Sequence, residues 1–94
     1  MAFDMSLALQ AQEVLDRIAD EKRRGKVENA LAKLANNPRH PGLNSHRFDA
    51  LDHIFDETVW ESYVENSAPS AWRIWWCYGP SQGQITVLKI GPHP

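Results

Sequence analysis

The sequence has few of the residues that hold together small secreted or zinc-bound domains. Cys77 is the only cysteine among 94 residues, which excludes an internal disulfide framework and a multi-cysteine zinc module. This composition fits a reducing compartment, and we expect a cytoplasmic protein. The first residues lack a basic segment followed by an apolar one, and the most apolar window, residues 72–78, is short and contains Arg73. The sequence therefore predicts neither secretion nor a membrane span.

An excess of positive charge is also missing. Ten Lys and Arg residues against twelve Asp and Glu residues give a formal net charge of −2. The global basic charge that drives binding to nucleic acids or anionic membranes is therefore absent. The distribution is uneven, because residues 21–47 contain seven basic and two acidic residues, whereas residues 48–66 contain six acidic residues and no Lys or Arg. A basic binding site must be local, and these two segments are the region to examine for a partner surface.

The first half of the chain has helical periodicity. At this length the 43% hydrophobic content supports one core, so we expect a single domain over residues 1–94. Apolar residues recur at helical steps over residues 6–23, with Asp4 or Ser6 as the expected N-cap. Gly25 breaks this pattern, and a second helix then runs until Pro38 stops it. The prediction is a helical hairpin over about residues 6–37, followed by an irregular connection over residues 38–44.

The second half has the composition of strands. Residues 58–65, 71–78 and 84–90 are rich in Val, Ile, Thr, Trp and Tyr, and short turn segments separate them. The gaps are too short for crossover helices, so we expect an antiparallel meander over about residues 46–91 with residues 71–78 as its central strand. Residues 46–51 are expected to add a short strand and residues 2–5 an edge. The predicted fold class is α+β, with the hairpin packed on one face of an antiparallel sheet of three to four strands.

Four segments in this order carry a family resemblance. They are LAKLANNPRHPGL after the first helix, then VWESYVEN, SAWRIWWCYG and the closing ITVLKIGPHP. Together they resemble the RelE/ParE toxin superfamily of type II toxin–antitoxin systems, in particular its small RelE-like members. The resemblance implies a compact α+β toxin fold, no metal or organic cofactor, and a cognate antitoxin that wraps around the domain. Relatives are either ribosome-dependent mRNA endonucleases or poisons of DNA gyrase.

The resemblance also implies two catalytic residues. The family's arginine on the middle strand corresponds to Arg73, a clamp for the scissile phosphate, and its basic residue after the last strand's glycine corresponds to His93, an acid or base. Two departures weaken the endonuclease reading. Basic residues of the preceding strand are replaced by the segment 61–65 with its two glutamates, and the C-terminal tyrosine of some members has no counterpart.

Further basic residues are candidates for binding phosphate. This expected set comprises Lys33, Arg39, His40, His46, Arg47 and Lys89. Each candidate has a structural alternative: Arg39 and His40 can cap the carbonyl end of the second helix, and Arg73 can stack on tryptophan or pair with Glu61 or Glu65. The four histidines form no His-x-x-x-His pair and there is no cysteine pair, so we expect no metal site. Trp75 and Trp76 are adjacent in a strand, and we expect one beneath the helices and the other exposed on the open face.

Three functions remain open at this stage. The first is the toxin of a type II pair acting as an endoribonuclease on mRNA, with Arg73 and His93 in the site. The second is a non-catalytic binding protein on the same fold, either directed at gyrase or bound only to a partner protein. The third is a homodimer that pairs through an edge strand and needs no chemistry.

Overall fold

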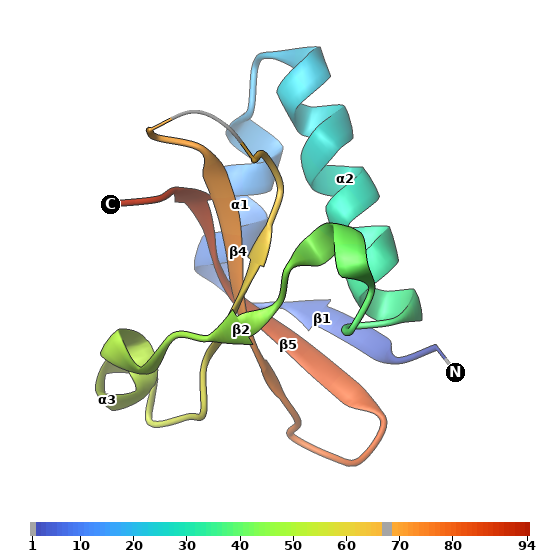
Figure 1. Ribbon diagram of the computed structural model, residues 1–94, viewed down its shortest axis with the longest axis vertical. Coiled ribbons are helices and arrows are strands. Elements are labelled where there is room, and N and C mark those ends of the chain that lie inside the picture. Colours follow the sequence, from blue (N-terminus) through green and yellow to red (C-terminus); the bar gives the residue numbers. More distant parts are fainter. Residues whose placement is uncertain (1, 67–68) are drawn as a thin grey trace.

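The protein is built on one twisted five-stranded sheet (Figure 1). The computed structural model describes residues 2–66 and 69–94. The strand order is β1-β5-β4-β3-β2, so the prediction that residues 71–78 form the central strand is confirmed. The strands are β1 (Asp4–Leu7), β2 (His46–Arg47), β3 (Trp60–Tyr63), β4 (Trp72–Tyr78) and β5 (Gln84–Pro92).

The sheet is mixed, although the sequence predicted an antiparallel one. Strands β2 to β5 do pair antiparallel, but β1 lies parallel to β5, with Asp4 opposite Gln84 and Leu7 opposite Val87. Parallel neighbours need a long connection between them, and here all the other helices and strands lie between β1 and β5 in the sequence. The edge strand expected at residues 2–5 is therefore shifted by two residues and completes a sheet of five strands.

The two predicted helices exist, but they meet at a different residue. Helix α1 spans Leu9–Arg17 and helix α2 spans Glu21–Asn36. The break lies at Asp20, whose carboxylate accepts hydrogen bonds from the backbone N–H groups of Lys22 and Arg23 and so caps α2. Gly25, the predicted break, lies inside α2. The expected caps of α1 are also wrong, because Asp4 and Ser6 belong to β1 and the helix follows Ala8 without a side-chain cap.

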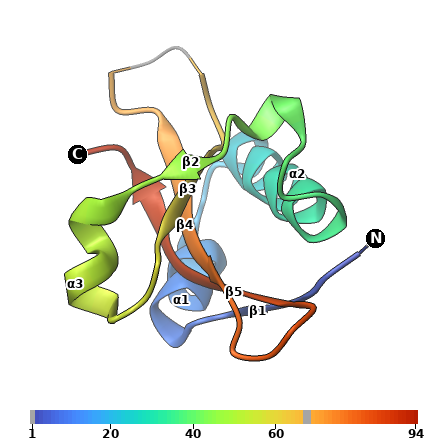
Figure 2. The ribbon, with the colours of Figure 1, turned by 60° about the horizontal axis from the view of Figure 1, so that its bottom comes forward.

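Both helices cover the same face of the sheet. Buried residues of α1 and α2 form the main core with alternate residues of β4 and β5, and Figures 1 and 2 show α2 running along that side of the sheet. The predicted packing of the hairpin on one sheet face is therefore confirmed. Residues of this core include Ala11, Val27, Leu31, Leu34, Ile74, Trp76, Ile85 and Val87.

The opposite face has a smaller core of its own. Trp75 packs there with Val59, Cys77 and Leu88 beneath the aromatic ring of Phe48 and the segment η2 (Asp49–Leu51) and α3 (Asp52–Phe55). Trp75 and Trp76 do point to opposite faces, but each is only 1% exposed, so the expectation of one exposed tryptophan is wrong. The short helical segment that shields Trp75 replaces most of the strand predicted at residues 46–51.

The remaining connections are short. The segment expected to be irregular contains one 3-10 turn, η1 (Pro41–Leu43), between α2 and β2. Among residues 2–66 and 69–94, no helix has both the length and the apolar character that crossing a bilayer requires.

Candidate functional site

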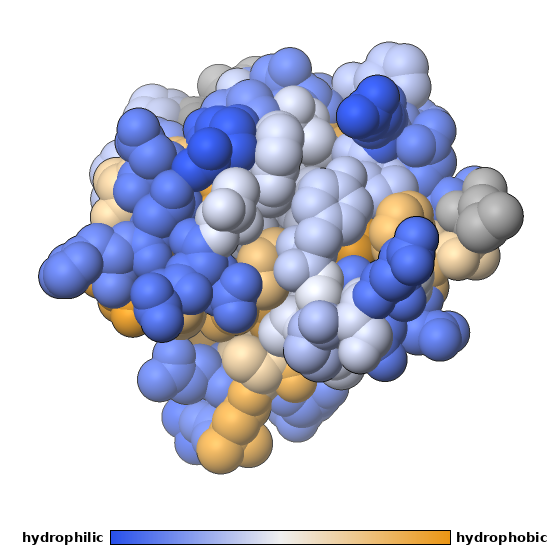
Figure 3. All heavy atoms as spheres, turned by 90° about the horizontal axis from the view of Figure 1, so that it is seen from below, coloured by the Kyte–Doolittle hydropathy of each residue, from blue (hydrophilic) through white to orange (hydrophobic). Residues whose placement is uncertain are grey.

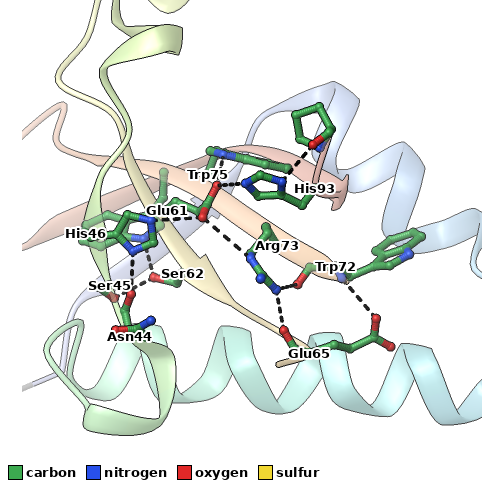
Figure 4. Close-up of polar contacts among 12 residues, drawn as sticks. Asn44, Ser45, His46, Glu61, Ser62, Glu65, Trp72, Arg73, Trp75 and His93 are labelled. Atoms are coloured by element: carbon green, nitrogen blue, oxygen red, sulfur yellow. Dashed lines mark hydrogen bonds and ion pairs between the residues drawn. The ribbon is translucent and has the colours of Figure 1, made fainter. Parts of the chain in front are cut away.

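A polar cluster occupies the part of the second sheet face that α3 leaves uncovered (Figure 4). Strand register builds it, because residues opposite each other on neighbouring strands point to the same side. One row crosses four strands and contains His46 of β2, Glu61 of β3, Trp75 of β4 and Lys89 of β5. The next row contains Tyr63, Arg73 and Gly91.

Glu61 lies at the centre of the cluster and is only 2% exposed. Its Oε1 atom lies 3.1 Å from His46 Nε2 and 3.7 Å from Arg73 Nε. Its Oε2 atom accepts a 3.0 Å hydrogen bond from the indole of Trp75 and lies 3.7 Å from His93 Nε2. A buried carboxylate is costly unless such partners surround it, so these four side chains hold the charge of Glu61 in place.

Arg73 is the most buried cation of the cluster, at 7% exposure. Its Nη1 donates to the backbone carbonyls of Glu65 and Trp72, and its guanidinium carbon lies 3.7 Å from the centre of the Tyr63 ring. The alternative of pairing with Glu61 or Glu65 is therefore realised, whereas the stacking partner is tyrosine instead of tryptophan.

The surroundings of Arg73 leave one of its donors unused. The buried Nε has no hydrogen-bond partner, since the nearest Glu61 oxygen is 3.7 Å away. Gly91 is opposite Arg73 in β5, and a Cβ placed on this glycine would meet no atom within 4 Å. Gly91 thus adds no side chain to the row of Arg73, although the glycine itself is buried.

The two histidines of the cluster are held differently. His46 is in hydrogen-bond distance of an acceptor at both ring nitrogens, Glu61 at 3.1 Å and the carbonyl of Asn44 at 2.7 Å. His93 contacts the carbonyl of Pro94 through Nδ1 at 2.9 Å, but its Nε2 stays 3.7 Å from Glu61. With 39% of its side chain exposed, His93 has a ring nitrogen that is free to exchange a proton with a ligand.

The cluster carries a local excess of positive charge. Arg73 and the exposed Lys89, whose ammonium lies 5.1 Å from the Trp75 ring centre, supply two permanent positive charges against the one negative charge of Glu61. Protonation of either histidine increases this excess. In a chain of net charge −2, this surface is one that an anion can approach.

Glu65 anchors the cluster to α2. Its carboxylate accepts hydrogen bonds from the backbone N–H of Trp72 at 3.1 Å and from Arg23 at 3.2 Å, and Lys26 lies 3.8 Å away. Burial alone would raise the pKa of Glu65, but the Trp72 hydrogen bond and the two cations of α2 outweigh it and lower the pKa. The backbone carbonyl of Glu65 accepts a hydrogen bond from Arg73 Nη1, so Glu65 fixes the position of Arg73 relative to α2.

The expected catalytic residues, Arg73 and His93, and the expected phosphate-binding residues fall into two groups. Arg73, His93, His46 and Lys89 converge in the cluster around Glu61. The others do not join it. Arg47 pairs with Asp52 at the sheet edge, while Lys33, Arg39 and His40 lie at the end of α2 and in the turn that follows. The side chain of His40 caps η1 by accepting the N–H of Gly42, and α2 has already ended at Asn36.

Sequence reasoning named Glu61 only as a possible partner of Arg73 and missed its central place in the cluster. The buried Glu61 contacts two histidines as well as Arg73. The alternation of β3 and its pairing with β4 could have placed Glu61 on the face of Arg73 and Trp75. No group of three or more His, Cys, Asp or Glu side chains suited to a metal ion occurs within the described ranges.

Comparison with known proteins identifies the fold. No family model matches the sequence, and no curated protein is significantly similar to it. Solved structures do match over the whole chain. RelE in the archaeal RelE–RelB complex of Pyrococcus horikoshii has a TM-score of 0.68 at 12% identity, with 98% of this chain and 96% of that chain covered.

Two further structures agree with this match. A YoeB/ParE toxin from Agrobacterium tumefaciens has a TM-score of 0.72 at 11% identity, covering 97% of this chain and 99% of that one. A chain of the intact E. coli RelBE toxin–antitoxin complex has a TM-score of 0.60 at 10% identity, with 99% of both chains covered. The chain therefore has the α+β fold of these toxins, as the resemblance in its sequence implied.

Proposed function

We propose that this chain, which has the RelE/ParE toxin fold, is the toxin of a type II toxin–antitoxin pair and cleaves mRNA through the cluster around Glu61. The observation that carries the proposal is the convergence of His46, Arg73, Lys89 and His93 from three strands onto one sheet face. Two of the similar structures are complexes with an antitoxin, which supports a cognate antitoxin as partner. An mRNA target on the ribosome places the action in the cytoplasm.

The chemistry assigned to this cluster is cleavage of RNA by its own 2′-hydroxyl group. That reaction needs a proton acceptor for the 2′-hydroxyl, a proton donor for the departing 5′-oxygen, and positive charge for the phosphorane. Arg73 and Lys89 supply the permanent positive charge on this face of the sheet. No metal is required for this route.

His93 is the residue that we assign to proton transfer. The His93 side chain is 39% exposed and its Nε2 lies outside hydrogen-bond distance of Glu61, whereas both nitrogens of His46 are already engaged. His46 is therefore a positioning residue that holds Glu61 and adds charge when protonated. The carboxylate of Glu61 lies 3.1 Å from His46 Nε2 and 3.7 Å from His93 Nε2, so it faces both rings.

A non-catalytic binding protein on the same fold is the second candidate. The burial of Arg73 and its use of two backbone carbonyls favour this alternative, because an arginine so engaged has fewer donors left for phosphate. In that case the molecule acts by binding, either to DNA gyrase or to its partner alone.

A growth experiment separates these functions. Wild-type protein, His93→Gln and the matched control His53→Gln, which changes an exposed histidine of α3, are induced in a bacterial host at equal levels. We expect growth arrest by wild type and His53→Gln and normal growth with His93→Gln. Growth arrest by all three proteins would refute the catalytic role of His93. Co-purification of gyrase with the protein from the arrested cells would then support the binding alternative.

A further inference from the structure

A second concave site lies on the other side of β2, away from the cluster around Glu61. Its volume is about 450 Å³, and its lining combines the aromatic residues Trp60, Trp76 and Tyr78 with Arg39 and His40. We propose that this pocket binds one nucleotide of the RNA strand, with the base against the aromatic wall and a phosphate on the basic rim. This inference rests on the proposed function, because it takes the ligand to be RNA.

The aromatic wall consists of two stacked indole rings and one tyrosine ring nearly perpendicular to them. Trp60 and Trp76 stack with their ring centres 6.0 Å apart and an angle of 21° between their planes. Tyr78 meets the Trp76 ring edge-on at 4.9 Å, and it is 45% exposed. The indole of Trp76 donates a 2.8 Å hydrogen bond to the buried Ser62, which fixes the wall. Trp76 is itself only 1% exposed, so a nucleobase would meet the exposed ring of Tyr78 and the partly buried ring of Trp60, with Trp76 as the support that keeps both in place.

None of the nine residues that line the pocket is acidic. Seen from below, the surface has a pale band of intermediate hydropathy between hydrophilic areas (Figure 3).

The rim of the pocket provides donors for a phosphate. Arg39 and Lys33 take part in no ion pair among the described residues. His40 accepts the N–H of Gly42 at Nδ1, so its neutral ring carries the proton on Nε2 as a free donor. Lys33 does not line the pocket but lies next to it: a Cβ placed on Gly42 would lie 3.1 Å from the His40 ring and 3.8 Å from Lys33 Nζ, so both groups border Gly42.

One RNA strand can reach both sites across the sheet edge. Ser45 lines the pocket, and the next residue, His46, contacts Glu61 on the opposite face. Strand β2 is the edge strand and contains only His46 and Arg47, so little protein separates the two sites. The pocket therefore suits a nucleotide that flanks the cleaved phosphodiester.

The test measures binding of adenosine 5′-monophosphate by NMR, with ribose 5-phosphate as the probe without a base. We expect the indole N–H signals of Trp60 and Trp76 to shift saturably with the nucleotide and much less with ribose 5-phosphate. Tyr78→Ala and Arg39→Glu should each weaken binding about tenfold, as loss of a stacking ring or a phosphate contact does. The matched control Lys22→Glu makes the same charge change at the other end of α2 and should keep the wild-type affinity.

The outcomes distinguish this pocket from the proposed catalytic cluster. Shifts confined to the indole of Trp75, or equal weakening by Lys22→Glu, would overturn the pocket. Binding of an acidic peptide there without binding of the nucleotide would do so as well. The assay needs no ribosome and no cleavage, and His93→Gln should leave the Trp60 and Trp76 shifts unchanged. If the nucleotide does not bind, the proposed toxin function is unaffected. If the protein does not arrest growth, the binding measurement still decides whether the pocket takes a nucleotide.

Discussion

Replacing Glu61 with glutamine removes the negative charge at the centre of the polar cluster and keeps the size of the side chain. The carboxylate is 2% exposed and faces three basic side chains within 3.7 Å. His46 and His93 are half-exposed and can turn to solvent. Arg73 cannot, since it is 7% exposed, so its charge stays buried without a counter-charge.

The cost follows from that uncompensated charge. Removing one partner of a buried ion pair costs about 3–5 kcal/mol. The lower end applies, because Arg73 retains its two carbonyl acceptors and its contact with the Tyr63 ring, and the glutamine oxygen can still accept from Trp75. We therefore expect Glu61→Gln to lower the free energy of unfolding by about 3 kcal/mol, a large part of the stability of a small domain.

Urea unfolding of purified protein at pH 7 measures this loss. With an m-value of about 1 kcal/mol/M, the midpoint should fall by about 3 M. The control is Glu57→Gln, an exposed acid without an ion pair in the described residues, which should change stability by less than about 0.5 kcal/mol. In a double-mutant cycle, the double variant Glu61→Gln/Arg73→Gln should lose about 1–3 kcal/mol less unfolding free energy than the sum of the two single variants. A loss below about 1 kcal/mol, or no coupling, would refute the reasoning.

Three further predictions test other parts of the structure. Asp20→Ala should destabilise the protein by about 1 kcal/mol, seen by thermal unfolding, because α2 loses its N-cap, whereas Gly25→Ala should not destabilise it. The pKa of Glu65 is lower in the folded than in the unfolded protein. The stability that its charge contributes is therefore complete above the unfolded pKa and is lost as the pH falls through the folded pKa. We expect Glu65→Gln to reduce the decrease in unfolding free energy between neutral and acid pH, as measured by urea unfolding at several pH values. Burial, with the nearby charge of Glu57, raises the pKa of the Cys77 thiol, so a thiol reagent should label Cys77 only after urea unfolds the chain, and rapid labelling of the folded protein would contradict this.

Local sequence patterns were sufficient for most of the fold. Periodicity predicted both helices and the three strands β3, β4 and β5, because each signal depends on a few neighbouring residues. The helix boundary failed because a glycine inside a helix costs only about 1 kcal/mol, which the cap at Asp20 and packing of α2 offset. Strand β1 pairs in parallel with a strand some 80 residues later, and no local pattern specifies such a partner.

The candidate site could be predicted from the sequence only in part. The family resemblance and residue type selected Arg73 and His93, and charge selected His46 and Lys89, all of which lie in one cluster. The role of Glu61 depends on the registers of β2, β3 and β4 together, since it contacts residues from 12 to 32 positions away. Lys33 and Arg39 lie apart from that cluster because α2 and the turn after it lie on the other side of β2, an arrangement that no local pattern specifies.

The most direct test of the toxin assignment is a cleavage assay with purified components. Wild-type protein, His93→Gln and His53→Gln are incubated with ribosomes translating a defined mRNA, and the ends of the RNA are mapped. The account predicts cuts by wild type and His53→Gln that leave a 2′,3′-cyclic phosphate and a 5′-hydroxyl, with at least a hundredfold slower cutting by folded His93→Gln, in line with the loss of a general acid or base. Intact mRNA after incubation with folded wild-type protein would contradict it.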